Sequence, residues 1–210
     1  MRVVAIKNAK TESEIRIVEE MYRLRSRIFH GRLAWDVDCT AGLEIDQYDD
    51  LNPTYILCLA GTGAVVGCAR LLPAMQRNML KEVFPQLLET GHLIAHNRMI
   101  ESSRFCVDTV VSAAREQGGL HSATLALFAG IVEWSILHGY REIVTATDVR
   151  LERIFRRTGW SLTRLGPPIQ INETKSVAGV LPADWSSFDL LRPSNYSSNF
   201  MTPTEELSCR

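Results

Sequence analysis

The spacing of apolar and polar residues predicts strands and helices in succession along the chain. A short apolar run, Val3 to Ile6, is typical of a strand. From Thr11 to Phe29, apolar residues recur every three or four positions, which predicts an amphipathic helix. Thr11 followed by Glu14 is a capping-box signature, and we expect Gly31 to end this helix.

The pattern changes after this helix. The segment from Leu33 to Pro53 has no comparable period, and two strands joined by a glycine turn follow it, at 54–60 and 64–72. The remaining expected elements are short helical pieces at 79–90, a strand at 101–108, a buried helix at 118–140, a strand at 141–147, a short helix at 148–159, and strands at 160–166, 169–175 and 176–182. We therefore expect one α/β domain over residues 1–184, with a sheet covered by helices, and a loosely held polar tail over 185–210.

Composition limits the classes of function. The 210 residues are 46% hydrophobic and 22% charged, and the net charge of −1 gives no general attraction to nucleic acid or an anionic membrane. No apolar run reaches the length of a membrane span, and the N-terminus lacks the cleavage site of a signal peptide. The five cysteines lack paired C-x-x-C spacing and are typical of reduced thiols. We expect a cytoplasmic protein.

Charge is unevenly distributed. No Lys or Arg occurs from Leu33 through Ala69, whereas six acids do: Asp36, Asp38, Glu44, Asp46, Asp49 and Asp50. An acidic loop beside Trp35 could receive a cation. The segment 150–164 is rich in arginine, at Arg150, Arg153, Arg156, Arg157 and Arg164, and could receive an acidic protein surface or a phosphate. The alternative is that both are solvated faces, which is the commoner meaning of charge runs.

The strand at 101–108 carries charges within an alternating pattern. Alternation predicts that Glu101 and Ser103 share one face with Phe105, while Arg104 lies on the other face with Cys106. Another charge, Arg70, interrupts an earlier apolar strand. Charged residues within strands need partners or a function, so they indicate a polar cleft over the sheet, or structural ion pairs.

Three other patterns are weaker. Gly118 and Gly119, ahead of the long helix, half-resemble the pyrophosphate loop of Gcn5-type acetyltransferases, but Leu120 replaces its last small residue, and a flexible linker is the alternative. His92 and His96 have the spacing of two metal ligands on a helix, but no third ligand is apparent, so we expect no metal. Ser102 and Ser103 lack the surroundings of a serine hydrolase.

Together these segments resemble the acyl-homoserine-lactone synthases, the LuxI-type autoinducer synthases of quorum sensing. The resemblance runs from the first helix to about Gly159 and rests on "RLRSRIF", "LAWDV", "GLEIDQYDDLNPTY", "GCARLLP" and "ESSRFCVD". The matching signature positions are Arg25, Phe29, Trp35, Asp46, Asp49, Arg70, Glu101 and Arg104.

The resemblance implies a three-layer α/β/α sandwich around a mixed sheet, similar to Gcn5-type N-acetyltransferases. It implies an acyltransferase that makes N-acyl-L-homoserine lactone from S-adenosylmethionine and acyl-[acyl carrier protein], releasing methylthioadenosine, with no cofactor. A pocket for S-adenosylmethionine is implied at Arg25, Phe29, Trp35, Asp46, Asp49 and Phe105. Arg25 and Arg70 are expected to pair with the acids. Carrier docking is implied at Arg150, Arg153, Arg156 and Arg157, and the phosphopantetheine phosphate near Gly118 and Gly119.

For the chemistry, the resemblance implies a catalytic set of Glu101, Arg104, Asp46, Asp49 and Arg70. Amide formation needs a base, and Glu101 is the candidate, with Arg104 orienting it or the substrate; alternatively Glu101 only positions an amine that arrives neutral. A threonine at Thr145 or Thr147, with Ser103, implies preference for a medium-chain 3-oxo-acyl group, although threonine is also common in strands.

Two other functions fit the sequence less well. One is an acyl-CoA-dependent N-acyltransferase with a different amine acceptor, which would need a better pyrophosphate loop than "REQGGL". The other is a nucleic-acid-binding module, which the near-zero net charge and the lack of a basic stripe with interleaved aromatics disfavour.

Overall fold

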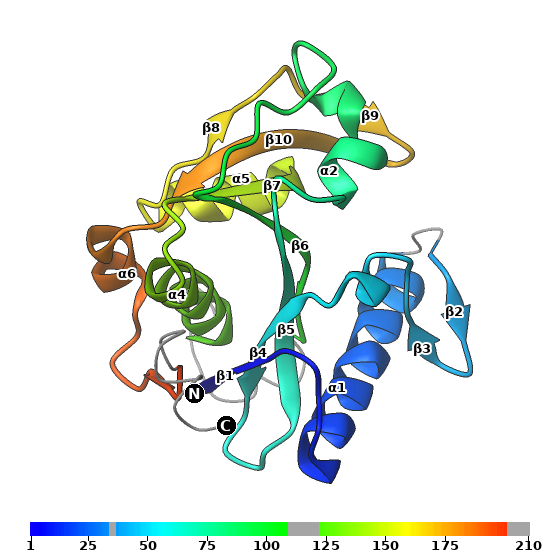
Figure 1. Cartoon of the computed structure of the whole chain (residues 1–210), viewed down its shortest axis with the longest axis vertical. Coiled ribbons are helices and arrows are strands. Elements are labelled where there is room, and N and C mark those ends of the chain that lie inside the picture. The colour runs from blue at the N-terminus through cyan, green and yellow to red at the C-terminus, as the bar shows by residue number, and fades with distance from the viewer. Residues whose placement is uncertain (34–36, 109–121, 201–210) are drawn as a thin grey trace. The chain divides into compact units, whose positions relative to one another are not determined.

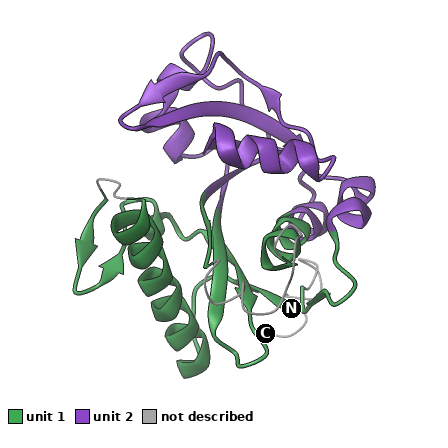
Figure 2. Ribbon diagram, turned by 180° about the vertical axis from the view of Figure 1, so that it is seen from behind, with its two compact units in different colours: residues 1–70, 104–131, 192–200 green, residues 71–103, 132–191, 201–210 purple. Residues whose placement is uncertain are grey.

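The computed structural model describes residues 1–33, 37–108 and 122–200 (Figure 1). The chain forms two compact units, which Figure 2 distinguishes by colour. Within the described residues, unit 1 comprises 1–70, 104–108, 122–131 and 192–200, and unit 2 comprises 71–103 and 132–191. Strands β5 (Val65–Pro73) and β6 (Met99–Val107) and helix α4 (Ser122–Leu137) contribute residues to both units.

Unit 1 contains a mixed sheet with the strand order β11-β1-β4-β5-β6. Strand β1 pairs antiparallel with β4 and parallel with β11. The elements of unit 1, besides its parts of β5, β6 and α4, are β1 (Arg2–Ile6), α1 (Glu12–Arg25), the π-helical segment η1 (Ser26–Arg32), β2 (Cys39–Thr40), β3 (Leu43–Glu44), the 3-10 turn η2 (Asp49–Leu51), β4 (Thr54–Leu59) and β11 (Ser197–Ser198).

Helices cover both faces of the unit 1 sheet. Alternate strand residues such as Val4 and Leu57 pack with Met21 of α1 in one buried cluster. The strand residues next to these in the sequence point to the other face. Val3 is one of them, and it contacts α4 so closely that a Cβ added to Gly130 of α4 would lie 2.6 Å from Val3 Cγ1. Because successive strand residues point to opposite faces, α1 and α4 lie on opposite sides of this sheet. Unit 1 thus has three layers, helix, sheet and helix.

Helix α1 begins as predicted and ends differently. The Thr11 hydroxyl accepts the Glu14 backbone N–H, and the Glu14 carboxylate accepts the Thr11 backbone N–H, so the capping box is confirmed. The predicted stop at Gly31 is wrong in detail, because the α-helix ends at Arg25 and continues as η1. The Leu33 N–H bonds to the Ile28 carbonyl five residues back, which is the wider π spacing.

In unit 2 the strand order of the sheet is β6-β7-β10-β8, with β9 paired to β10. Strand β7 is parallel to β6 and antiparallel to β10. The elements of unit 2, besides its parts of β5, β6 and α4, are α2 (Met79–Glu82), the 3-10 turn η3 (Pro85–Leu87), β7 (Glu142–Asp148), α5 (Val149–Arg157), β8 (Thr163–Arg164), β9 (Ile169–Ile171), β10 (Thr174–Pro182) and α6 (Trp185–Leu191). Residues of α2 and η3 pack on one face of this sheet, and α5 covers the other (Figures 1 and 2).

The sheets flanked by helices confirm the α/β class. The expectation of a loosely held polar tail from Trp185 is wrong for the described residues up to 200. Asp184 caps helix α6 by accepting the Ser187 N–H at 2.7 Å, and Phe188 and Leu191 are buried. Further on, β11 adds to the edge of β1 in unit 1. Buried apolar side chains and strand pairing therefore hold this segment in place, although most of its residues are polar.

Candidate functional site

Unit 1 buries a cluster of six charged side chains. We call it the ionic cluster: Arg25, Arg70, Arg104, Glu44, Asp46 and Asp49. Arg25 and Glu44 are fully buried and Arg70 is 1% exposed. Three positive and three negative groups balance, which is the condition under which charges are tolerated in an interior.

Arg25, the last residue of α1, is bound on two sides. Its Nη1 and Nη2 donate to the two oxygens of Asp49, each at 2.9 Å. Its Nε donates to Glu44, which lies in β3. This paired geometry fixes the guanidinium plane and ties α1 to the loop before β4.

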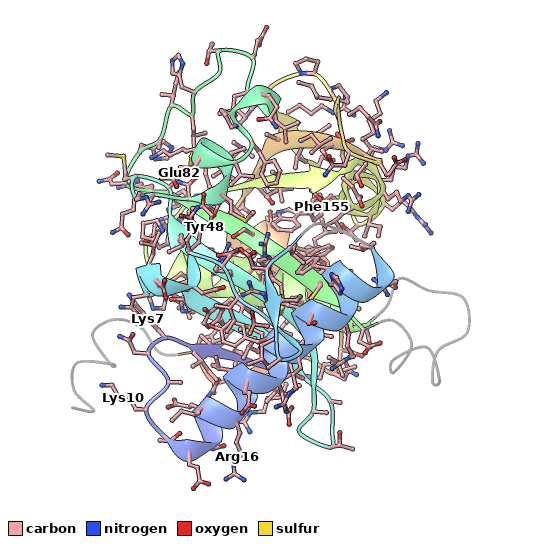
Figure 3. All side chains as sticks on the ribbon, turned by 90° about the vertical axis from the view of Figure 1, so that its right-hand side faces the viewer. Lys7, Lys10, Arg16, Tyr48, Glu82 and Phe155 are labelled. Carbon is pink, nitrogen blue, oxygen red and sulfur yellow. The ribbon has the colours of Figure 1, made fainter. Side chains whose placement is uncertain are left out.

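Arg70 approaches the same acids from β5. Its Nη1 contacts Asp46 Oδ1 at 2.5 Å and Asp49 Oδ1 at 3.0 Å. Its guanidinium carbon lies 5.4 Å from the ring centre of Tyr48, a side chain 2% exposed among packed neighbours (Figure 3). The predicted pairing of Arg25 and Arg70 with the acids is confirmed.

Arg104 joins the cluster from β6 with a strained backbone. Its Nε and Nη2 each lie 2.9 Å from Glu44 Oε1, and Nη2 also lies 2.7 Å from Asp46 Oδ2. Its guanidinium stands 5.6 Å from the ring centre of Phe29. The φ of Arg104 is +53°, a left-handed conformation that costs a side-chain-bearing residue about 1 kcal/mol or more. The ion pairs hold this residue in a conformation that it would not otherwise prefer.

Pairing sets the ionisation of the cluster. Burial alone would lower the pKa of Arg25, but hydrogen bonds and charge attraction from Asp49 and Glu44 outweigh it and raise the pKa well above the ordinary value. Burial alone would raise the pKa of Asp49, but Arg25 and Arg70 lower it to about 2. The Arg25–Asp49 pair is therefore fully ionised at neutral pH, and Asp49 is a poor proton acceptor.

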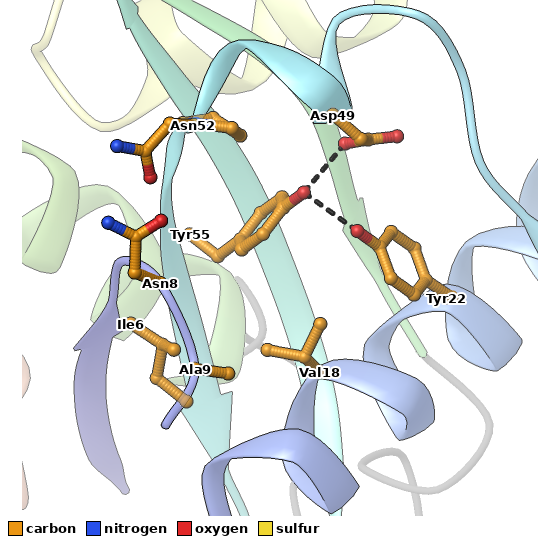
Figure 4. A pocket seen from close by; sticks show the side chains of 9 residues that line it. Ile6, Asn8, Ala9, Val18, Tyr22, Asp49, Asn52 and Tyr55 are labelled. Carbon is orange, nitrogen blue, oxygen red and sulfur yellow. Dashed lines mark hydrogen bonds between the residues drawn. The ribbon is translucent and has the colours of Figure 1, made fainter. Parts of the chain in front are cut away.

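A pocket of about 170 Å³ lies beside the cluster in unit 1 (Figure 4). Asp49, Tyr22 and Tyr55 line it together with Asn8, Asn52 and apolar residues. The Tyr55 hydroxyl donates to Asp49 Oδ1 at 2.8 Å, and the Tyr22 and Tyr55 hydroxyl oxygens are 2.9 Å apart. Burial raises the pKa of both tyrosines, so both hydroxyls keep their protons.

Of the other predicted site residues of unit 1, Phe29 contacts the ionic cluster and Phe105 does not. Phe29 of η1 is buried and faces Arg104. Phe105 stacks on Phe128 of α4, with ring centres 5.0 Å apart. Since Cys106 packs in the cluster on the α1 side, the structure does not bring Phe105 to the ionic cluster. The predicted sites Trp35, Gly118 and Gly119 lie outside the described residues.

Glu101 lies in unit 2, in the first half of β6. It is 1% exposed, and its Oε1 accepts the Leu80 backbone N–H of α2 at 2.7 Å. A backbone amide thus contributes to the orientation of Glu101, and the expected role of Arg104, orienting Glu101 or the substrate, stays a prediction.

Helix α5 of unit 2 presents the predicted arginines to solvent. Arg150, Arg153, Arg156 and Arg157 are all exposed, and they lie on the side of the helix away from buried Phe155. Glu152, the only acid of this helix, is bound by Arg164 of β8, whose Nε and Nη2 donate at 2.6 and 2.7 Å. This pairing leaves the exposed face of α5 with an uncompensated positive charge.

The predicted acyl-selectivity residues also lie in unit 2. Thr145 and Thr147 share one face of β7, opposite Gly179 and Val177 of β10. Thr145 is 7% exposed, and its hydroxyl donates to the neighbouring Ala146 carbonyl at 3.3 Å. Ser103 of β6 is half-buried.

Sequence reasoning missed three members of this site. Glu44 was counted among the acids but given no role, although it bonds to both Arg25 and Arg104. Tyr22 and Tyr55 lie within the helix expected at 11–29 and the strand expected at 54–60, and the sequence pattern indicates no role in a site for either of them. The one available signal was the absence of a basic residue from Leu33 through Ala69, which left the acids of this segment to find partners elsewhere.

Two features are absent from the described residues. No group of three or more His, Cys, Asp or Glu side chains in them is arranged to hold a metal ion. No helix in them is long and apolar enough to span a membrane.

Known proteins share the whole of this architecture. The chain is 51% identical over 198 residues to an acyl-homoserine-lactone synthase of Agrobacterium fabrum, covering 94% of each chain. It is similar to a crystal structure of TofI in a ternary complex with an inhibitor and MTA, with 28% identity, a TM-score of 0.76, and coverage of 91% of this chain and 96% of that one. It also shares the fold of a CoA-dependent acyl-homoserine lactone synthase, BjaI, solved with SAM and isopentyl-CoA, with 24% identity, a TM-score of 0.81, and coverage of 99% of both chains.

These similarities define the protein as an enzyme of the acyltransferase class. The family model for autoinducer synthases matches residues 8–191. The chain belongs to this family, and its activity is that of an acyl-homoserine-lactone synthase of quorum sensing.

Proposed function

We propose that this enzyme makes N-acyl-L-homoserine lactone from S-adenosylmethionine and an acyl group carried on acyl carrier protein. The observation that carries the proposal is the ionic cluster, which occupies five of the eight positions by which the sequence resembles the family. MTA in the related TofI structure fits the expected by-product, methylthioadenosine.

The ionic cluster suits the amino-acid substrate by shape rather than by net charge. Its arginines already neutralise its acids, so a sulfonium would not meet a region of excess negative charge. We propose that Arg25, Asp46 and Asp49 instead hold the loop around η2 rigid, so that Phe29 and Trp35 can border the pocket for S-adenosylmethionine. Rigid preorganisation of this kind lowers the entropy lost on binding.

Glu101 is the proposed base for amide formation. The α-ammonium of S-adenosylmethionine must lose a proton before its nitrogen can attack the thioester carbonyl, and a carboxylate can accept that proton directly or through one water. The Leu80 N–H bond at 2.7 Å supports this role, because it fixes the direction of the side chain. The C–S bond of the tetrahedral intermediate then breaks, and the proton that the attacking nitrogen loses balances the one gained by the sulfur, which leaves as the carrier thiol.

Lactonisation follows within the bound product. The substrate carboxylate attacks its own γ-carbon, and the carbon–sulfur bond breaks with its electrons on sulfur, which leaves as neutral methylthioadenosine. No proton is transferred in this step, and the closure is intramolecular, so orientation accounts for it without a cofactor. Arg70 and Arg104 are proposed to keep the cluster in the orientation that this step needs.

The exposed arginines of α5 support acyl carrier protein as the donor. Such carriers are strongly acidic, and four exposed arginines with the local acid bound by Arg164 form a complementary surface. Acyl-CoA is the second candidate, because the related BjaI is a CoA-dependent acyl-homoserine lactone synthase. Phosphate contact at Gly118 and Gly119 remains part of the proposal for either donor.

For the acyl group, we propose a medium chain with a 3-oxo substituent. Thr145 is the stronger of the candidate selectivity residues because it is buried, whereas Thr147 and Ser103 are less so. A buried hydroxyl can donate to a keto oxygen in place of its long bond to Ala146. We propose a cytoplasmic location, where both substrates are made, consistent with four described cysteines that are free thiols.

One assay tests these choices together. Purified enzyme is given S-adenosylmethionine with 3-oxo or unsubstituted acyl groups of equal length, each on acyl carrier protein or on CoA, and lactones and methylthioadenosine are measured by mass spectrometry. We expect equimolar lactone and methylthioadenosine, with the highest kcat/KM for the 3-oxo-acyl carrier. Higher kcat/KM with acyl-CoA would reject the carrier, and equal use of both acyl types would reject the 3-oxo preference.

A further inference from the structure

The two tyrosines beside Asp49 have no part in the function described so far. Tyr55 of β4 is 7% exposed, and Tyr22 lies on α1, three residues before Arg25. Their rings meet edge to face, with centres 6.1 Å apart, and their hydroxyls point toward each other and toward Asp49 (Figure 4). All of these residues belong to unit 1.

The direction of the hydrogen bonds follows from counting protons. Asp49 is ionised and can only accept, so the single hydroxyl proton of Tyr55 is directed to Asp49 Oδ1 at 2.8 Å. The Tyr55 oxygen is then the acceptor in its 2.9 Å contact with Tyr22, which must donate. The result is a directed chain from Tyr22 through Tyr55 to Asp49.

This chain of hydrogen bonds is not suited to moving protons. The pKa of Asp49 is about 2, whereas burial raises that of Tyr55 above its ordinary value of 10.0, so Asp49 neither holds a proton nor takes one from Tyr55 at neutral pH. What the chain does is limit the position of the carboxylate. Asp49 Oδ1 accepts hydrogen bonds from Arg25, Arg70 and Tyr55. Tyr55 donates through a rigid aromatic ring on a strand, whereas the two arginines donate through long side chains.

Tyr22 also acts on the other half of the ion pair. The guanidinium carbon of Arg25 lies 5.3 Å from the Tyr22 ring centre. The ring therefore contacts the cation while the hydroxyl supports the hydrogen bond to the anion. A shift of either tyrosine would remove one of the contacts that fix the position of the Arg25–Asp49 pair.

We propose that Tyr55, oriented by Tyr22, is a positioning residue for the S-adenosylmethionine pocket, acting through Asp49 and Arg25. This inference rests on the proposed role of the ionic cluster in forming that pocket. Neither tyrosine is proposed to touch a reacting atom.

The test is steady-state kinetics of the full chain carrying Tyr55→Phe. Losing a hydrogen bond to a charged group should raise the KM for S-adenosylmethionine about tenfold. The kcat and the KM for the acyl donor should stay within about twofold, because the proposed positioning concerns one substrate pocket. Tyr140→Phe is the matched control, since Tyr140 is a half-buried tyrosine of unit 2, and it should leave all three constants unchanged.

The serial arrangement gives a second readout. Tyr22→Phe keeps the ring over Arg25 and removes the donor to Tyr55, so its effect should be in the same direction and smaller. The double variant should be no worse than Tyr55→Phe alone, because the Tyr22 hydroxyl acts through Tyr55. If the effects of the two single variants on this KM were additive, the proposed hydrogen-bond chain would be wrong. An unchanged KM for S-adenosylmethionine in folded Tyr55→Phe would also overturn the proposal.

A purely structural role would have another signature. It would lower the unfolding temperature and the amount of active enzyme, while the KM of the folded fraction stayed constant, and that outcome would also overturn the proposal. The wild-type enzyme is assayed first: if it does not consume S-adenosylmethionine at all, the proposed function fails before the role of Tyr55 is at issue.

Discussion

Arg25 and Asp49 face each other through two parallel N–H···O bonds of 2.9 Å, with both side chains almost fully buried. The pair joins the end of α1 to the turn η2, two elements that lie far apart along the chain. Because α1 also carries Phe29 in its π-helical continuation, the ion pair sets where the aromatic side of the proposed pocket lies. Order in this part of unit 1 therefore depends on electrostatics as well as on apolar packing.

We expect Asp49→Asn to destabilise the protein and to change its response to acid. Leaving Arg25 buried without its anionic partner should cost about 3 to 5 kcal/mol at pH 7. The folded-state pKa of Asp49 is lowered from 3.8 to about 2, so its stabilising contribution is present above pH 4 and is lost as the pH falls through 2. That contribution is about 2 kcal/mol. Urea unfolding of both proteins between pH 7 and pH 2 measures it, and equal acid sensitivity of the two would contradict it.

Glu101→Gln should abolish catalysis without unfolding the protein. The glutamine oxygen can still accept the Leu80 N–H, but the side chain can no longer take a proton, so kcat should fall about 100-fold or more. Glu142→Gln is the control, because Glu142 is a half-exposed acid of the same unit paired with His96, and it should behave like wild type. Near-normal turnover in Glu101→Gln would remove Glu101 from the proton transfer and leave it a positioning role.

Thr145→Val tests the choice between two threonines that the sequence could not separate. Valine keeps the β-branched shape for the strand and removes the hydroxyl, so the preference for 3-oxo over unsubstituted acyl donors should fall about tenfold. Thr147→Val, on the same face of β7 but less buried, should leave the preference intact. Competition between the two acyl donors in one reaction gives the ratio directly. If both variants keep the wild-type ratio, selectivity lies elsewhere in the chain.

Gly179→Ala should destabilise unit 2, since Gly179 is where β10 comes close to its neighbours. An added Cβ would lie 2.2 Å from Leu162 Cδ2 and 2.7 Å from the Thr163 carbonyl oxygen, and the latter is backbone that cannot rotate away. The expected loss is about 1 to 3 kcal/mol. Gly61→Ala is the comparison, because nothing lies within 4 Å of a Cβ there. Equal unfolding temperatures for the two variants would argue against this close approach.

Much of the fold could be predicted because its signals are local. The capping box at Thr11 and Glu14 marks the start of α1, and the alternating or continuous apolar runs mark β4, β5 and β7. The continuation of α1 as a π-helix could not be predicted, since nothing in the 3.6-residue pattern distinguishes it. The helix α6 was missed because its few apolar residues, of which Phe188 and Leu191 are buried, run directly into a polar, proline-bearing sequence.

The candidate site was predictable in its residue types and not in its pairing. A segment with six acids and no base requires cations from elsewhere, and buried Arg25 and Arg70 were the available ones. Glu44 was overlooked because β3 is two residues long and leaves no periodic pattern. The positive φ of Arg104 is a tertiary effect: its ion pairs stabilise a conformation that local preference disfavours, so no local rule could have found it.

Reversing charge on α5 should weaken use of the carrier-bound substrate alone. Arg153→Glu with Arg156→Glu replaces two exposed cations on the face proposed for acyl carrier protein, so the KM for acyl-[acyl carrier protein] should rise about tenfold or more. The KM for S-adenosylmethionine should not change. The wild-type KM for the carrier should also rise with added salt, and more steeply than the KM of the variant. The reason is that salt screens electrostatic attractions, and fewer of these remain in the variant.

The control for this experiment must change the net charge equally elsewhere. Lys7 and Lys10 are exposed cations of unit 1 at the approach to α1 (Figure 3). Lys7→Glu with Lys10→Glu therefore alters the total charge by the same amount without touching α5. If the two double variants raise the carrier KM equally, the effect is one of overall charge, and α5 is an ordinary solvated face. A rise confined to the α5 variant assigns the docking surface to Arg153 and Arg156.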